Sequence, residues 1–198
     1  MDLQQFVIPI YRSICSRPSW AGTGFLIDGH LITAGHVVTD YQPYYALIDR
    51  QFVTLEPGLW SPTLLPSADK LEYDVTIYPM PGVKSALTLA TEDIGGHAEV
   101  DVLCWQWREG GVRRVATRGV TLGDAPEDGY LLMATVDHIT NGCSGCPVLD
   151  GTSVVGIVTM VKVPDPGRPA PPGLRAVMDA NTCWVFKAGH IRRFMPAG

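Results

Sequence analysis

The sequence predicts an all-β fold of many short strands, and its turn residues and apolar runs are the observations that predict it. The 198 residues include 21 glycines and 16 prolines, which divide the chain into short segments. Between these turn residues lie runs rich in β-branched and aromatic residues, as strands require. The stretch with helical spacing is 188–194, where Ile191 and Phe194 lie three residues apart, and it predicts a short C-terminal helix.

The whole-chain chemistry argues against several classes of protein. Apolar residues make up 46% and charged residues 18%, so the chain is not disordered, and the net charge of −5 gives no general attraction for nucleic acid. No apolar run reaches the ~18 residues of a membrane-spanning helix, and residues 1–5 lack the features of a secretory signal. The cysteines are odd in number and irregularly spaced, which favours reduced thiols in the cytoplasm. They are Cys15, Cys104, Cys143, Cys146 and Cys183.

The strands can be placed in order along the chain. In the hairpin, two β-prone runs flank Asp28-Gly29, which is a strong turn signal. The first strand contains Pro9, which is typical of an edge strand. The expected strand segments are residues 6–14, the hairpin 22–38, the strand pair 44–55, then 71–78, 98–107, 112–122, 129–136, 154–161 and 183–186. Proline-rich loops are expected at 57–66 and 164–173, and the turn-rich stretch 79–97 is the candidate connection between two units.

A serine flanked by glycines is the strongest candidate for chemistry. In Gly142-Cys143-Ser144-Gly145 the glycines predict a tight turn that exposes the hydroxyl and aims N–H groups at one point. His36 follows the end of a predicted strand, and Asp74 precedes another, so a rigid scaffold would present both side chains. Asp40, Asp49 and Asp69 also lie between the histidine and the serine, and Asp40 and Asp69 occupy turn-like settings.

Three segments resemble those of the chymotrypsin-like serine proteases. Residues 22–37, with GTGF and LITAGHV, resemble the histidine segment, and YDVTI at 73–77 resembles the aspartate segment. GCSGCPV at 142–148, followed by GIVT at 156–159, resembles the serine segment and the strand after it. The order of histidine, aspartate and serine is that of this family, and the resemblance covers most of the chain.

The resemblance implies two antiparallel six-stranded β-barrels with the active site in the cleft between them. Residues 1–80 would form the N-terminal barrel, 81–97 the connection, and 98–198 the C-terminal barrel with the nucleophile, oxyanion hole and P1 pocket. Ser144 would attack a peptide carbonyl, His36 would transfer the proton, and Asp74 would orient His36. The backbone N–H groups of Gly142 and Ser144 would bind the oxyanion, and no cofactor is implied.

Cys143 marks a departure from the secreted digestive branch of the family. Those enzymes carry there an aspartate that receives the cleaved N-terminus, so this activation switch is missing. Small size, unpaired cysteines and no signal segment instead resemble the processing proteases of positive-strand RNA viruses. That resemblance implies a polypeptide substrate, a viral polyprotein including the chain's own ends, in the cytoplasm of an infected cell. The alternatives are a bacterial or other cellular trypsin-like protease, and a non-catalytic protease-fold module that binds RNA or protein.

The resemblance also indicates where a substrate would bind. His138, six residues before the serine, would lie near the floor of the P1 pocket, where it could accommodate an acidic or amide side chain or simply fill space. Thr159, Met160 and Val161 would pair with the substrate backbone and form one wall. Relatives that cut after Gln or Glu often place a histidine on this strand, and this chain has none there. Val161, where many digestive members have glycine, would narrow the pocket toward smaller P1 residues.

The same segment contains a Cys-x-x-C sequence, which elsewhere marks redox or zinc sites. A redox site would need a helix after Pro147, and none is expected. A zinc site would need a second pair of ligands, whereas Cys15, Cys104 and Cys183 are scattered singly, so no metal is expected. Viral relatives also use cysteine as the nucleophile, but Ser144 occupies the position between the glycines.

Overall fold

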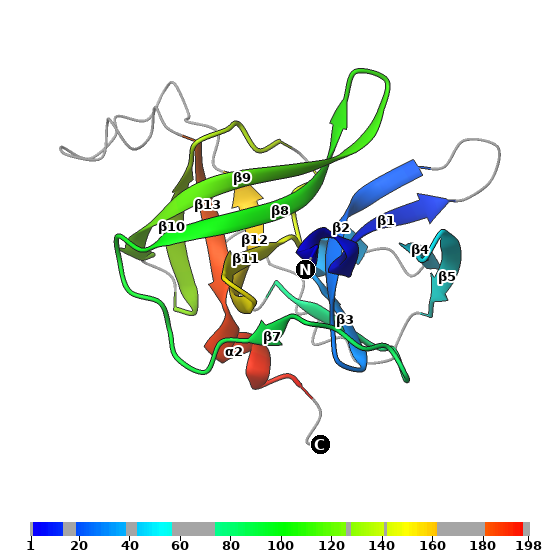
Figure 1. The fold of residues 1–198 in the computed structure, drawn as a ribbon, viewed down its shortest axis with the longest axis horizontal. Coiled ribbons are helices and arrows are strands. Elements are labelled where there is room, and N and C mark those ends of the chain that lie inside the picture. The colour runs from blue at the N-terminus through cyan, green and yellow to red at the C-terminus, as the bar shows by residue number, and fades with distance from the viewer. Residues whose placement is uncertain are drawn as a thin grey trace.

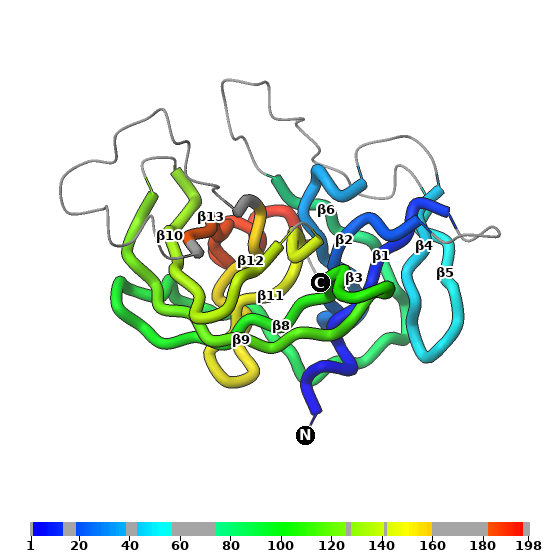
Figure 2. Tube along the Cα trace, turned by 90° about the horizontal axis from the view of Figure 1, so that it is seen from above, coloured from blue at the N-terminus to red at the C-terminus, as the bar shows by residue number. Residues whose placement is uncertain are grey.

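The computed structural model describes residues 2–13, 19–38, 43–56, 74–125, 128–140, 142–161 and 181–195, without the side chains of 160, 161 and 181. These residues form two sheets that lie side by side, as Figures 1 and 2 show from two directions. Helical structure in the described part consists of the 3-10 helices η1 (Leu3–Phe6) and η2 (Gly35–Val38) and the α-helix α2 (Ala188–Arg192). The all-β prediction and the short C-terminal helix are therefore confirmed.

The first sheet has six antiparallel strands in the order β5-β4-β1-β2-β3-β6. Their bounds are β1 Val7–Ser13, β2 Ser19–Ile27, β3 His30–Thr33, β4 Tyr44–Ile48, β5 Gln51–Leu55 and β6 Thr76–Pro79. β2 and β3 form the expected hairpin, and Gly29 adopts a φ of 73° in its turn. A cluster of buried apolar side chains, which includes Ile10, Leu26 and Leu31, packs inside this sheet. The loop expected at 57–66 lies outside the described residues.

The prediction that Pro9 marks an edge strand is wrong. β1 lies inside the sheet, between β2 and β4. Pro9 is paired with Thr23 of β2, whereas the described pairing with β4 begins one residue later, at Ile10. The missing N–H of the proline therefore falls outside the ladder to β4, which explains why an interior strand tolerates it.

The second sheet closes into a barrel. Its order is β11-β8-β9-β10-β13-β12-β7, and an additional pairing of β11 with β12 closes six of these strands. β7 pairs in parallel with β12 outside that ring, and the other pairings are antiparallel. The bounds are β7 Thr88–Leu89, β8 Glu99–Arg108, β9 Gly111–Asp124, β10 Tyr130–Thr135, β11 Pro147–Asp150, β12 Ser153–Val161 and β13 Asn181–Lys187.

The two sheets meet along β1, β2 and β8. The indole N–H of Trp105 on β8 donates to the Val7 carbonyl of β1 over 2.9 Å, and its backbone N–H donates to the Thr23 hydroxyl of β2 over 3.1 Å. The first six strands form an open sheet in the described pairings, so the two-barrel prediction holds as one closed barrel and one sheet. The division of the chain at 80 and 97 stays a prediction, and the loop expected at 164–173 lies outside the described residues.

Candidate active site

His36 and Asp74 meet at the edge of the first sheet. η2 follows β3 and carries His36, while Asp74 lies two residues before the buried start of β6. Nδ1 of His36 lies 2.6 Å from Oδ2 of Asp74, and the backbone N–H of His36 donates to Oδ1 over 2.8 Å. Because a carboxylate oxygen can only accept, Nδ1 carries the proton and Nε2 presents its lone pair. Two donors fix the carboxylate, and the carboxylate fixes the ring.

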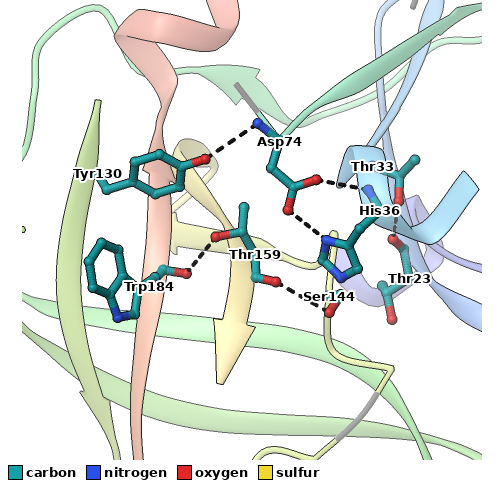
Figure 3. Close-up of polar contacts among 8 residues, drawn as sticks. All are labelled: Thr23, Thr33, His36, Asp74, Tyr130, Ser144, Thr159 and Trp184. Atoms are coloured by element: carbon teal, nitrogen blue, oxygen red, sulfur yellow. Dashed lines mark hydrogen bonds and ion pairs between the residues drawn. The ribbon is translucent and has the colours of Figure 1, made fainter. Parts of the chain in front are cut away.

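Ser144 lies on the other side of this ring. In Figure 3 the imidazole of His36 stands between the carboxylate of Asp74 and the hydroxyl of Ser144. The serine belongs to the turn before β11 of the second barrel, so the two sheets contribute different members of the group. Among the described residues its hydroxyl donates to the Thr159 carbonyl at 3.5 Å, the upper limit of a hydrogen bond, and not to His36.

Thr23 of β2 holds the serine turn from across the interface. Its hydroxyl donates to the Gly142 carbonyl over 2.8 Å, and its backbone N–H donates to the Ser144 carbonyl over 3.0 Å. The same hydroxyl accepts the backbone N–H of Trp105, and the Thr33 hydroxyl donates to the Thr23 carbonyl over 2.7 Å. Thr23 is fully buried, so these bonds are made away from water. One residue thus fixes the carbonyls on both sides of Cys143.

Two glycines of the turn are required by their surroundings. Gly142 has a φ of 98°, and a Cβ there would lie 1.6 Å from the Trp20 ring. Gly145 has a φ of 83°, and a Cβ there would lie 2.1 Å from the Thr23 carbonyl oxygen. Positive φ and close approach both exclude larger residues. The glycines therefore allow the turn to pack directly against β2.

The turn leaves N–H groups available for a ligand. The Cys143 carbonyl accepts the Cys146 N–H over 2.9 Å. In a trans peptide the N–H points opposite to the C=O, so the Ser144 N–H is aimed away from that turn bond. Within the described residues, no hydrogen bond uses the N–H of Gly142 or of Ser144. This is the arrangement that an oxyanion site needs.

The residues expected around a substrate lie in two places. His138 is exposed in the segment between β10 and the serine turn. Thr159 is buried, its hydroxyl donates to the Trp184 carbonyl over 3.3 Å, and the pairing of β12 with β13 shifts register there. The backbones of Met160 and Val161 continue β12, and their side chains lie outside the described part. The role of all four residues in substrate binding stays a prediction.

Comparison with known proteins identifies the fold. No family model matches the chain, and no curated protein matches its sequence. Its structure is similar to mouse neuropsin, a serine protease, with a TM-score of 0.71 and 13% identity over 96% of this chain and 92% of neuropsin. It is also similar to the active form of the Rv3671c protease from Mycobacterium tuberculosis, with a TM-score of 0.66 and 20% identity over 99% and 85% of the chains. The serine endoprotease of Yersinia pestis is similar too, with a TM-score of 0.68 and 13% identity over 96% of this chain and 61% of that protein's chain.

The chain has the trypsin fold. Identities of 13–20% establish the arrangement of the chain and leave the activity to be argued from the site. The chymotrypsin-like resemblance is thus confirmed at the level of fold, and the resemblance to viral processing proteases stays a prediction. Within this trypsin fold, η2, the start of β6 and the turn before β11 bring the three predicted catalytic residues to one place.

Sequence reasoning missed two residues that support this site of the trypsin fold. Thr23 lies in the GTGF segment quoted for the resemblance, but nothing local shows that its hydroxyl reaches a residue 119 positions away. Tyr130 of β10 is buried, and its hydroxyl accepts the backbone N–H of Asp74 over 3.3 Å. Both bonds cross between the sheets. An aromatic or hydroxyl residue in a strand gives no local signal of such a contact.

Cys143 points away from this site into the second barrel. Its side chain is fully buried, and its contact with Cys104, together with burial, raises the pKa of its thiol. A buried, protonated thiol is a poor nucleophile, which favours Ser144 over Cys143 in that role. Among the described residues, no three His, Cys, Asp or Glu side chains are grouped so as to hold a metal ion. In the same part of the chain, no helix is long and apolar enough to cross a membrane.

Proposed function

We propose that this protein is a serine endopeptidase that cleaves peptide bonds through Ser144, His36 and Asp74. The observation that carries the proposal is the His36–Asp74 pair, in which Nδ1 and Oδ2 are 2.6 Å apart. The imidazole of this pair is directed toward a serine in a glycine-flanked turn. Nucleophile, base and orienting acid in this relation are the requirements of acyl transfer. The trypsin fold, which the chain shares with serine proteases, supports the proposal by analogy.

In the first step the Ser144 hydroxyl leaves the Thr159 carbonyl by rotation about χ1 and donates to Nε2 of His36. Its present bond is long and weak, so the rotation costs little. Ser144 then attacks the substrate carbonyl while Nε2 takes its proton. Asp74 holds the imidazolium through the 2.6 Å contact, and His36 returns the proton to the leaving amine. Water then hydrolyses the acyl-enzyme by the same route.

The N–H groups of Gly142 and Ser144 would stabilise the oxyanion that forms in each half-reaction. The Ser144 N–H shares its peptide with the Cys143 carbonyl, which accepts the Cys146 N–H over 2.9 Å, and Thr23 and the two glycines hold the whole turn against β2, so the shape of the turn is set in advance. Preorganised donors need no rearrangement when the charge develops, and one such donor is worth about 3 kcal/mol of barrier. The serine turn therefore supplies both the nucleophile and the oxyanion site.

The substrate is proposed to be an extended polypeptide that adds to β12. Along residues 159–161 this strand pairs with β13 on one side. The described pairings with β7 and β11 end before that stretch, at residues 154 and 157. The other edge of Thr159–Val161 is thus open within the described residues, and the Thr159 carbonyl faces Ser144. An open edge beside the nucleophile suits a peptide that binds as an additional strand.

Processing of a viral polyprotein, including the chain's own ends, is the proposed biological role, in the cytoplasm of an infected cell. The free thiols of the four described cysteines are compatible with a reducing compartment. The alternative is a cellular trypsin-like protease, and the structural similarity to the bacterial Rv3671c and Yersinia proteases favours it. A peptide library that includes peptides spanning the chain's ends decides between them. Cleavage of the end peptides supports self-processing, and cleavage of unrelated peptides alone supports the cellular alternative.

The catalytic proposal is tested by labelling with a fluorophosphonate probe and by peptide cleavage. The wild-type protein should be labelled at Ser144, and Ser144→Ala should lose both labelling and cleavage while its urea unfolding curve stays unchanged. Ser153→Ala, at the start of β12, is the matched control and should keep full activity. A wild-type protein that is folded but never labelled would instead support the non-catalytic binding module.

A further inference from the structure

Four buried cysteines surround the base of the serine turn, and the catalytic proposal uses none of them. Cys104, Cys143, Cys146 and Cys183 belong to one apolar cluster inside the second barrel, and each is at most 1% exposed. They come from β8, the serine turn and β13, so only the tertiary fold brings them together. All four are free thiols.

Cys104 interacts with two of the other thiols, those of Cys143 and Cys146. The Cys143 thiol donates to the Cys104 sulfur, and the two sulfurs are 2.8 Å apart. The side-chain amide of Gln106, itself fully buried, donates to Cys143 over 3.0 Å and to Cys104 over 3.5 Å. A disulfide has an S–S distance of about 2.05 Å, so the pair needs to close by only about 0.8 Å. Cys183 has a different partner, because its thiol donates to the Met133 carbonyl at 3.6 Å.

We propose that Cys104 and Cys143 form an oxidation site: a peroxide converts the pair into a disulfide, and this bond reversibly disables Ser144. The inhibitory part rests on the proposed serine peptidase function. The assignment of the cross-link itself rests only on the thiol geometry.

The chemistry is a two-electron oxidation by a peroxide. The Cys104 thiol gives up its proton as its sulfur attacks one peroxide oxygen and the O–O bond breaks, which leaves a sulfenic acid on Cys104, and the departing hydroxide takes that proton and leaves as water. The Cys143 sulfur then attacks the Cys104 sulfur, and the second water leaves as the S–S bond forms. Two thiols and one hydrogen peroxide thus give one disulfide and two waters. Cys104 reacts first because it accepts the hydrogen bond from Cys143, which stabilises its thiolate.

Burial limits which oxidant can act. Cys104 and Cys143 are 1% and 0% exposed, so bulky disulfides cannot reach them without unfolding of the turn, whereas hydrogen peroxide is small and neutral. Although the bond from Cys143 favours the Cys104 thiolate, Cys146 and burial outweigh it and raise the pKa of Cys104. The thiols therefore stay reduced under ordinary conditions and respond only to sustained peroxide.

The disulfide would act on the serine through the backbone. Cys143 and Ser144 share a peptide, and the N–H of that peptide is the proposed oxyanion donor. Closing the sulfurs by about 0.8 Å pulls Cys143 toward β8, while Thr23 still holds the Gly142 and Ser144 carbonyls on β2. The N–H is turned away from the oxyanion position, and a misplacement of about 1 Å can cost 10²-fold in rate.

The test compares the reduced protein with the protein treated with hydrogen peroxide and then with catalase. Peptide mapping without reductant should find Cys104 joined to Cys143, with the loss of two hydrogens. Labelling of Ser144 by the fluorophosphonate probe should slow about 10- to 100-fold, and dithiothreitol should restore it. Cys104→Ala should give no cross-link and keep its labelling rate after peroxide. Cys183→Ala, another buried thiol of the cluster, should behave as the wild type.

Several results would overturn the proposal. A cross-link from Cys104 to Cys146, which is a second neighbour of Cys104, would show that the pair is wrongly assigned. Sulfinic acids without any cross-link, or full labelling of the cross-linked protein, would also exclude it. The wild-type peptide map remains decisive even where a cysteine variant fails to fold. The peptide map does not depend on a reactive serine. If the map shows the cross-link but the reduced protein is never labelled at Ser144, the catalytic function and its inhibition are overturned, and the assignment of the cross-link stands.

Discussion

Removal of the Thr23 hydroxyl is the sharpest test of how the two sheets cooperate. Thr23→Val keeps the size and branching of the side chain but deletes one oxygen. That oxygen donates to the Gly142 carbonyl over 2.8 Å and accepts the Trp105 N–H over 3.1 Å. The bond from the Thr23 backbone N–H to the Ser144 carbonyl is untouched. The substitution therefore releases one end of the serine turn and leaves the other end held.

The expected loss of stability follows from the two groups left behind. Each lost hydrogen bond is worth about 1 kcal/mol net, and an acceptor or donor left unpaired out of water costs about 1–3 kcal/mol. Thr23→Val should thus lower the free energy of unfolding by about 2–4 kcal/mol. Because the Gly142 carbonyl is one of the two groups that hold the serine turn on β2, its release lets the turn that carries Ser144 shift, and the rate of Ser144 labelling should fall by at least about 10-fold.

Two further variants separate positioning from general destabilisation. Thr23→Ser keeps the hydroxyl and should recover most of the labelling rate. Thr76→Val makes the same chemical change at a buried hydroxyl that has no hydrogen-bond partner among the described residues, so it should leave labelling unchanged and raise stability by about 1 kcal/mol. For the three variants, urea unfolding gives the change in the free energy of unfolding, and the kinetics of the fluorophosphonate probe give the rate of Ser144 labelling. If Thr23→Val loses stability but labels at the wild-type rate, the positioning role is refuted.

Three other changes have defined outcomes. Asp74→Asn should lower kcat for peptide cleavage about 10⁴-fold with little change in KM, because His36 loses its orienting acceptor; unchanged kcat would remove Asp74 from the mechanism. Gly145→Ala should prevent the turn from packing against β2. Gly151→Ala, also at positive φ but facing open space, should lower the free energy of unfolding by only about 1 kcal/mol, measured by thermal unfolding. Equal losses for the two variants would contradict the claim that close packing excludes a side chain at Gly145. Burial raises the pKa of the Cys183 thiol, so the folded state binds its proton more tightly than the unfolded state. The contribution of this proton to the free energy of unfolding is fully present below the ordinary thiol pKa and falls by about 1.4 kcal/mol per pH unit above it. Cys183→Ala should therefore lose stability less steeply in urea unfolding between pH 8.5 and 10, and identical slopes would contradict this.

Local sequence signals placed most strands correctly, and the failures have a common cause. The Asp28-Gly29 turn and the apolar run of β12 were readable because a turn type or a buried strand depends on adjacent residues. β7 was not readable, since two residues form a strand only through pairing with β12. Pro9 was misplaced at an edge because the register of β4, and not the proline itself, decides whether an N–H is needed.

In the candidate site, too, some residues could be predicted from the sequence and others could not. His36, Asp74 and Ser144 stand out in the sequence because each lies at a strand end or in a glycine turn, and their catalytic roles stay predictions. The bonds that hold them do not stand out, since Thr23 reaches across 119 residues and Tyr130 across 56. Chemistry that needs one residue type is visible locally, whereas positioning needs a partner that only folding supplies.

The sequence by itself determined an all-β chain, its main turns and a serine between glycines, because propensity and backbone freedom act over a few residues. Only the tertiary structure decided that Cys143 faces Cys104 at 2.8 Å inside the barrel while Ser144 faces His36 outside it. Neighbouring side chains of one turn point in opposite directions, so the fold, and not the Cys-x-x-C spacing, sets which thiols meet.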